Sequence, residues 1–143
     1  METRAPQLLR HFGIKQTRPR LAMLRALMEA EGPLTHDALE QRLKPQRVNR
    51  VTIYRVLDCF LEAGLVHRID AGDRQWRFAL CACGTAGHCH PHFICRLCGR
   101  VDCLPGMDLP SADAAPGGYR VEAQEYYLRG LCPQCIEDNK NGL

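Results

Sequence analysis

Apolar residues recur at helical spacing near the start of the chain and predict a first long helix. The helix spans Arg18–Glu31, and its buried face consists of Leu21, Leu24, Leu27 and Met28. Pro19 suits the first turn, where the N–H that proline lacks would have no partner within the helix. Gly32 and Pro33 follow directly and end the helix.

Two more helices and a β-hairpin follow before the chain reaches residue 81. Thr35 can cap a second helix, which stops before Pro45, and Asn49 can cap a third. The third helix runs to Ala63. The inner faces consist of Ala38, Leu39 and Leu43 in the second helix and of Ile53, Val56, Leu57 and Phe60 in the third. The stretch LVHRIDAGDRQWRFAL then alternates as two strands around a turn at 71–73. Three helices followed by a hairpin predict a winged helix-turn-helix.

The chain changes character near Leu80, because one cysteine precedes this residue and eight follow it. We expect a hinge at 80–84, an N-terminal domain over 1–82 and a smaller C-terminal domain over 83–143. The C-terminal part reads as short strands, predicted at His92–Cys95, Gly99–Cys103 and Tyr119–Leu128. The stretch 104–118 contains three prolines and three glycines, so we expect a loop with at most one or two helical turns. The predicted fold class is therefore α+β.

Composition narrows the class of protein. The 143-residue chain is 45% hydrophobic but has no apolar run of the roughly 20 residues that a membrane span needs. The N-terminus lacks the apolar segment of a secretory signal. We therefore expect a cytoplasmic protein with no membrane partner. Nine cysteines in a reducing compartment indicate metal or redox chemistry rather than disulfides.

Positive charge gathers in the N-terminal part. Residues 1–80 carry 14 Lys and Arg against 9 Asp and Glu, whereas residues 81–143 carry 5 against 7. On a helical wheel Arg47, Arg50 and Tyr54 lie within about 60° of each other, if the third helix extends back to residue 47. Such a stripe suits the major groove of DNA. The alternatives are ordinary surface charge and a solvated helix face.

Two Cys-x2-Cys pairs indicate a structural metal site. CRLC supplies Cys95 and Cys98, and CPQC supplies Cys132 and Cys135. Four thiolates complete a closed tetrahedral site of the kind that holds structural zinc. The alternatives are a redox Cys-x2-Cys motif and free thiols.

The segment VNRVTIYRVLDCFLEAGLV, with its Thr-x-Tyr-Arg core, resembles the recognition-helix segment of the ferric uptake regulator superfamily. GIKQTRPRLAML resembles the junction at that family's first helix, and with the cysteine pairs the resemblance covers about residues 8–136. It implies a C-terminal α/β dimerisation domain stapled by zinc. It also implies that Tyr54 and Arg55 contact the major groove and that Lys15 reaches a minor groove. The full set of expected DNA-binding residues is Lys15, Arg47, Arg50, Thr52, Tyr54 and Arg55.

The resemblance also implies a second, regulatory metal site. Counting from the structural cysteines, the family's ligand positions fall at Cys83, His90, His92 and Cys103. Other candidate ligands nearby are Asp70, Cys81, His88 and Cys89. The family's further histidine falls at Pro33 and is absent, and we interpret the neighbouring His36 as an exposed helix residue. Two sulfur and two nitrogen donors favour Zn(II), whereas Fe(II) and Mn(II) prefer more oxygen ligands.

The resemblance therefore predicts a dimeric, zinc-dependent repressor that binds an AT-rich palindromic operator and controls metal uptake genes. Each chain would hold one structural and one regulatory Zn(II), with Fe(II) or Mn(II) as alternatives at the regulatory site. We expect no enzymatic activity and no small-molecule substrate. Two alternative functions stay open: an iron- or peroxide-responsive regulator of the same superfamily, and a thiol redox switch or zinc-buffering protein.

Overall fold

The computed structural model describes residues 4–81, 91–104, 107, 114–122 and 124–142. The chain divides into two compact units, Met1–Gly84 and Thr85–Leu143, called here the N-terminal and the C-terminal unit. Each unit is described by itself. Within the described residues, no helix has both the length and the apolar character needed to cross a membrane.

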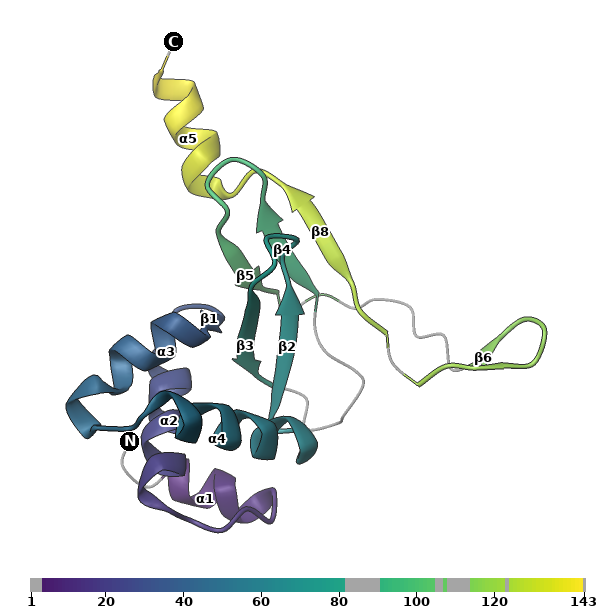
Figure 1. The fold of residues 1–143 in the computed structure, drawn as a ribbon. Coiled ribbons are helices and arrows are strands. Elements are labelled where there is room, and N and C mark those ends of the chain that lie inside the picture. Colours follow the sequence, from purple (N-terminus) through teal and green to yellow (C-terminus); the bar gives the residue numbers. More distant parts are fainter. Residues whose placement is uncertain (1–3, 82–90, 105–106, 108–113, 123, 143) are drawn as a thin grey trace. The chain divides into compact units, whose positions relative to one another are not determined.

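Helices make up most of the N-terminal unit (Figure 1). They are α1 (Arg4–His11), α2 (Arg18–Glu29), α3 (His36–Leu43), the 3-10 turn η1 (Lys44–Gln46) and α4 (Arg50–Glu62). The predicted caps are confirmed: the side chains of Thr35 and Asn49 accept hydrogen bonds from Ala38 N (3.2 Å) and Thr52 N (2.8 Å). The structure differs from the prediction in two details. The helix α2 ends at Glu29 rather than at residue 31, and the apolar pattern did not predict α1.

The apolar residues that set the helical pattern form the core of this unit. Leu24, Leu39 and Phe60 are fully buried, and Leu21 and Met28 pack half-buried against the cluster. Burying an aliphatic or aromatic side chain of this size contributes roughly 1.5–3 kcal/mol. The hydrophobic effect therefore holds α2, α3 and α4 together and leaves the opposite face of α4 in solvent.

A small antiparallel sheet completes the N-terminal unit. Its order is β1 (Leu34–Thr35), β3 (Trp76–Leu80) and β2 (Val66–Asp70), with Arg68 opposite Phe78. The predicted hairpin is thus confirmed. The strand β1 was not predicted, because two residues are too few to show an alternating pattern. With α3 and α4 before it, the β2–β3 hairpin is the wing of a winged helix-turn-helix.

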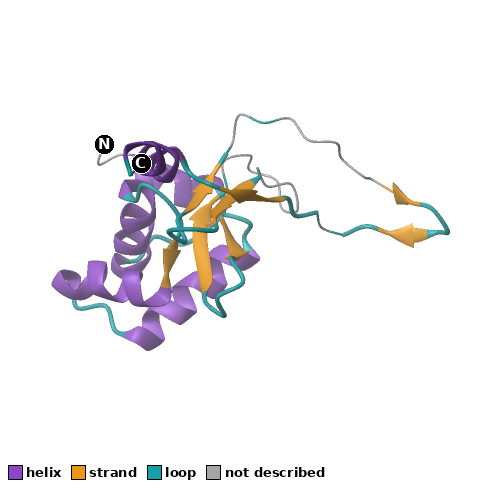
Figure 2. Cartoon of the chain, turned by 90° about the horizontal axis from the view of Figure 1, so that it is seen from above, coloured by secondary structure: helices purple, strands orange, loops and turns teal. Residues whose placement is uncertain are grey.

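The C-terminal unit is built on a three-stranded sheet (Figure 2). Its order is β5 (Val101–Cys103), β4 (His92–Cys95) and β8 (Tyr127–Gly130); β5 runs antiparallel and β8 parallel to β4. A separate two-stranded ribbon pairs β6 (Ala114–Ala115) with β7 (Tyr119–Arg120), and α5 (Pro133–Asn141) follows β8.

Three predictions for this unit need correction. The single strand expected over Tyr119–Leu128 is two strands, because β7 pairs with β6 whereas β8 pairs with β4. The strand expected from Gly99 begins at Val101, because Gly99 takes a left-handed turn conformation (φ 77°). The helix α5 was not predicted. Much of 104–118, predicted as a loop, lies outside the described residues, and β6 occupies part of the rest.

Candidate metal centres and DNA-binding surface

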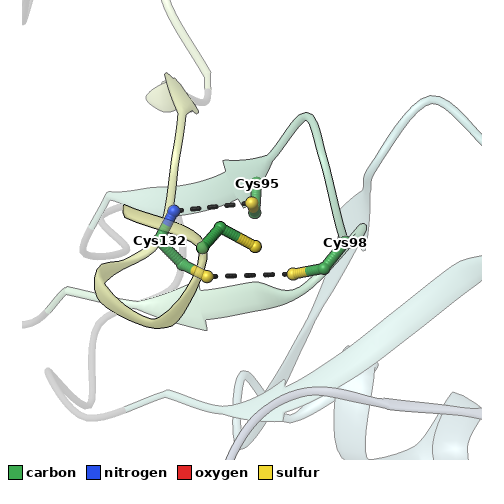
Figure 3. Close-up of side chains that lie close together, drawn as sticks. Cys95, Cys98 and Cys132 are labelled. Atoms are coloured by element: carbon green, nitrogen blue, oxygen red, sulfur yellow. Dashed lines mark hydrogen bonds between the residues drawn. The ribbon is translucent and has the colours of Figure 1, made fainter. Parts of the chain in front are cut away.

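Four cysteine side chains of the C-terminal unit converge, as the two Cys-x2-Cys pairs predict (Figure 3). Cys95 ends β4 and Cys98 lies in the turn that follows, whereas Cys132 caps α5 and Cys135 lies in its first turn. All four Sγ atoms lie within 4.8 Å of one another. Backbone geometry supports the cluster, because the N–H of Cys132 donates to Cys95 Sγ at 3.4 Å.

The spacing of the sulfur atoms fits a tetrahedral metal ion. The Sγ atoms of Cys98 and Cys132 lie 3.8 Å apart. A tetrahedral zinc ion with Zn–S bonds of about 2.3 Å separates its sulfur ligands by about 3.8 Å. The four residues can therefore hold Zn(II) with little rearrangement of their side chains.

The acid–base properties of the cluster also favour a cation. Hydrogen bonds from backbone N–H groups, chiefly that of Cys98, lower the pKa of Cys95 to about 6. The neighbouring thiol of Cys132 and burial raise the pKa of Cys135 to about 12. Four thiols this close cannot all ionise without a compensating positive charge. A divalent ion supplies that charge, so the donor set fits a metal better than it fits four free thiols.

Two of the expected regulatory ligands face each other within the C-terminal sheet. His92 on β4 is the antiparallel partner of Cys103 on β5, so their side chains point to the same face of the sheet. His92 is 5% exposed, and Cys103 is half-buried. An imidazole and a thiol in this relation can share one metal ion. The other two expected ligands, Cys83 and His90, lie outside the described residues, as do the candidates His88 and Cys89.

A second histidine–cysteine pair lies in the N-terminal unit. His67 Nδ1 on β2 is 3.3 Å from Cys81 Sγ, just after β3. Cys81 was among the candidates, but His67 was missed. The pair depends on the register of the hairpin, because His67 is the partner of Ala79 and Cys81, two positions further on, is its diagonal neighbour. The candidate Asp70 instead closes the wing turn, where its Oδ1 accepts from Gly72 N at 2.8 Å.

The solvent face of α4 carries the expected DNA-contacting side chains. Val51, Tyr54 and Arg55 are exposed on this helix, and the exposed fraction of Tyr54 is 42%. Arg50 begins the helix and forms ion pairs with Glu40 (3.2 Å) and Asp37 (3.5 Å) on α3. A helix with one buried face and a mixed apolar and basic outer face suits insertion into a major groove.

The other three expected DNA contacts are Arg47, Thr52 and Lys15. Arg47 is not part of α4, because Asn49 caps the helix and Arg47 has a left-handed backbone (φ 56°) after η1. The proposed wheel stripe therefore does not include Arg47, although its side chain is exposed. Thr52 is half-buried and donates its N–H to the cap. Lys15 is exposed between α1 and α2.

The interpretation of His36 as an exposed helix residue was wrong. His36 begins α3 and is half-buried, because its ring lies 4.0 Å from that of Tyr54 and 4.9 Å from that of Phe78, centroid to centroid. Burial and the nearby Arg50 lower the pKa of His36, which favours a neutral ring at neutral pH.

Comparison with known sequences places the chain among metal regulators. The model of the ferric uptake regulator family matches residues 11–111. The ferric uptake regulation protein of Escherichia coli K12 is 33% identical over 138 residues, which cover 91% of this chain and 90% of the relative. The zinc uptake regulation protein of the same strain is 29% identical over 140 residues, covering 93% and 80%.

Solved structures agree with this placement at the level of the fold. A zinc uptake regulator complexed with zinc and DNA superposes with a TM-score of 0.71 at 24% identity, covering 97% of this chain and 95% of that one. The predicted order, a winged helix followed by a small α/β unit, is therefore confirmed at the level of the fold. The chain belongs to the ferric uptake regulator family of metal-responsive transcription regulators.

Proposed function

We propose that this protein is a zinc-dependent transcriptional repressor that binds operator DNA as a homodimer. The observation that carries the choice of metal is the pairing of His92 with Cys103 on neighbouring strands. An imidazole and a thiolate are donors that suit Zn(II), whereas Fe(II) and Mn(II) prefer sites richer in oxygen. The overall identities do not separate the two readings, because the named iron and zinc regulators are 33% and 29% identical to this chain.

We propose Cys83, His90, His92 and Cys103 as the regulatory ligands. The neighbouring side chains of His67 and Cys81 in the N-terminal unit are alternative metal donors. Two nitrogen and two sulfur donors would suit Zn(II), which would supply the positive charge that favours the thiolate form of the cysteines. Cys83 lies before the boundary between the units in the sequence, and the other three residues lie after it. Because Cys83 belongs to the expected hinge at 80–84, metal occupancy would be coupled to the geometry of DNA binding.

We propose that α4 reads the major groove through Tyr54 and Arg55, and that Arg50 and Arg47 approach the phosphates. A dimer would present two copies of α4 to a palindrome whose half-sites lie about one DNA turn, or a multiple of it, apart. Lys15 and Thr52 would add contacts at the margins of this surface. The exposure of Tyr54 and Arg55 on a helix whose other face is buried supports this assignment.

The deciding experiment is fluorescence anisotropy of an AT-rich palindromic operator with the full chain under reducing conditions. Buffered Zn(II), Fe(II) and Mn(II) are titrated separately, and bound metal is counted in the same samples. Tight binding at the lowest free zinc, with two zinc ions per chain, is the expected result. Binding driven only by iron or manganese would assign the protein to the iron or peroxide branch of the family.

The thiol-switch alternative makes a different prediction. Mild peroxide would form disulfides among the cysteines outside the four-cysteine cluster, and the protein would show no preference for an operator over random DNA. We expect instead an operator preference that depends on metal and persists without any oxidant.

A further inference from the structure

An aromatic cluster joins the two helices of the helix-turn-helix to the wing. His36 begins α3, Tyr54 lies on α4 and Phe78 lies on β3. The rings of His36 and Tyr54 lie 4.0 Å apart at 35°, and Phe78 meets the His36 ring edge-on at 72°. Phe78 is 2% exposed, so the imidazole rests on a fixed part of the core.

Tyr54 has a second neighbour besides His36. The guanidinium of Arg50 lies 5.8 Å from the Tyr54 ring centroid. Arg50 is itself tied to α3 through Glu40 at 3.2 Å and Asp37 at 3.5 Å. The tyrosine ring thus has a histidine against it and an arginine above it, yet it keeps 42% of its exposure. An exposed tyrosine without such contacts would sample several rotamers.

We propose that His36 is a positioning and specificity residue, which holds the Tyr54 ring in the single orientation that presents it to a thymine methyl in the major groove. This inference rests on the proposed DNA-reading role of α4. A side chain that is already ordered before binding does not pay the entropy cost of being immobilised when the DNA binds. The 5-methyl group of thymine is the apolar feature of the major groove that an aromatic ring can contact.

The chemistry of His36 suits a stacking role. Its Nδ1 atom is buried and has no hydrogen-bond partner among the described residues. The ring therefore contacts its neighbours mainly through its aromatic faces and edges. A phenylalanine at this position would keep an aromatic ring in a somewhat larger side chain and would lack the ring nitrogens, so His36→Phe is the matched control for His36→Ala.

The test uses the zinc-loaded full chain and an operator selected by that chain from random double-stranded DNA. Each thymine of the operator is replaced in turn by deoxyuridine, which lacks the methyl group. The thymine read by Tyr54 is the one whose replacement weakens the unaltered protein but not Tyr54→Ala. Anisotropy with His36→Ala, His36→Phe and the double variant His36→Ala/Tyr54→Ala then completes the set, with thermal unfolding to verify that each variant is folded.

We expect His36→Ala to weaken operator binding about 3- to 10-fold, the effect of losing one aromatic contact. The same variant should lose most of the deoxyuridine penalty at the Tyr54 position and keep its affinity for random DNA. His36→Phe should retain both the affinity and the penalty. The double variant should bind no more weakly than Tyr54→Ala.

Any one of the following results would overturn the proposal. In the first, His36→Ala keeps the full loss of affinity when deoxyuridine replaces the thymine read by Tyr54. In the second, His36→Ala weakens binding to the operator and to random DNA equally. In the third, there is no thymine whose replacement weakens the unaltered protein but not Tyr54→Ala. A different result marks failure of the proposed function: if Tyr54→Ala binds the operator normally, α4 does not read DNA through this residue, and both proposals fall. Loss in Tyr54→Ala with normal binding by His36→Ala refutes the positioning role alone.

Discussion

Cys98 Sγ and Cys132 Sγ lie 3.8 Å apart although 34 positions separate the two residues in the sequence. The chain between them leaves the sheet at β5, forms the β6–β7 ribbon and returns as β8 beside β4. The buried cluster that closes this excursion consists of Cys95, Cys132 and Cys135, with Phe93 and Leu131 against it. Among the described residues this apolar cluster is small, and a bound metal ion would add to its stability.

We predict that Cys132→Ser removes one zinc ion per chain and unfolds the C-terminal unit. Structural zinc contributes on the order of 10 kcal/mol in small domains, which is comparable to a typical domain's whole stability. Metal counting and thermal unfolding measure the effect. Cys59→Ser is the matched control, because Cys59 belongs to α4 and packs against the core of the N-terminal unit. An unchanged metal count in Cys132→Ser would contradict a four-cysteine zinc site.

We predict that His92→Ala removes a different zinc ion and leaves the fold intact. The side chain is one donor of the proposed regulatory site, and Cys103 opposite it would remain without its partner ligand. The variant should keep one zinc per chain, unfold within a few degrees of the unaltered protein, and lose zinc-dependent operator binding. His11→Ala, an exposed histidine at the end of α1, should change none of these. A normal zinc response in His92→Ala would exclude His92 as a ligand.

We predict that Arg55→Ala weakens operator binding by about 1–3 kcal/mol while both zinc ions stay bound. Arg55 is exposed on α4, where a guanidinium can donate two hydrogen bonds to a guanine edge or clamp a phosphate. If Arg55 contacts a base, its loss would relax specificity at one operator position. If it contacts a phosphate, its loss would reduce the salt dependence of binding. Arg25→Ala on the exposed face of α2 is the control. Equal affinities for the two variants would remove Arg55 from the interface.

The sequence predicted the N-terminal unit better than the C-terminal unit, and burial explains the difference. The periodic residues of α2, α3 and α4 all enter one core, and Thr35 and Asn49 mark two helix starts. In the C-terminal unit the strands have two to four residues, which is too few for periodicity to show. Pairing of β8 with β4 across a long excursion is set by distant contacts that no local pattern carries.

The candidate site shows the same division. The four-cysteine cluster followed from spacing alone, because each Cys-x2-Cys pair acts as one local unit. The His67–Cys81 pair was missed because it depends on hairpin register. The burial of His36 was misjudged because its neighbours Tyr54 and Phe78 come from two other elements. Local motifs were therefore legible, whereas contacts between elements required the structure.

We predict that Asn49→Ala lowers the free energy of unfolding by about 1 kcal/mol. The Asn49 Oδ1 atom accepts the Thr52 N–H at 2.8 Å, and alanine would leave this donor of α4 to solvent. Denaturant unfolding of the zinc-loaded protein measures the change. Asn49→Ser should retain most of the stability, since serine caps helices about as well as asparagine. If both variants unfold alike, the cap does not stabilise α4.

The ion pair in the wing gives a prediction about pH. Arg77 donates two hydrogen bonds to Asp73, at 3.0 and 2.7 Å. These bonds, with other smaller effects, lower the pKa of Asp73 from 3.8 to about 2 in the folded chain. A carboxyl group whose pKa falls on folding stabilises the protein above its unfolded pKa, and this contribution is lost as the pH falls from about 4 toward 2. Because Asp73 is 44% exposed, we expect this contribution to stability to be at most about 1 kcal/mol.

Asp73→Asn should therefore be less stable than the unaltered chain at neutral pH, and the difference should shrink below pH 4. The single tryptophan, Trp76 in the wing, reports unfolding by fluorescence. Glu31→Gln, which alters an exposed carboxylate outside this pair, should show no such trend. A pH-independent difference for Asp73→Asn would show that its ionisation does not stabilise the wing.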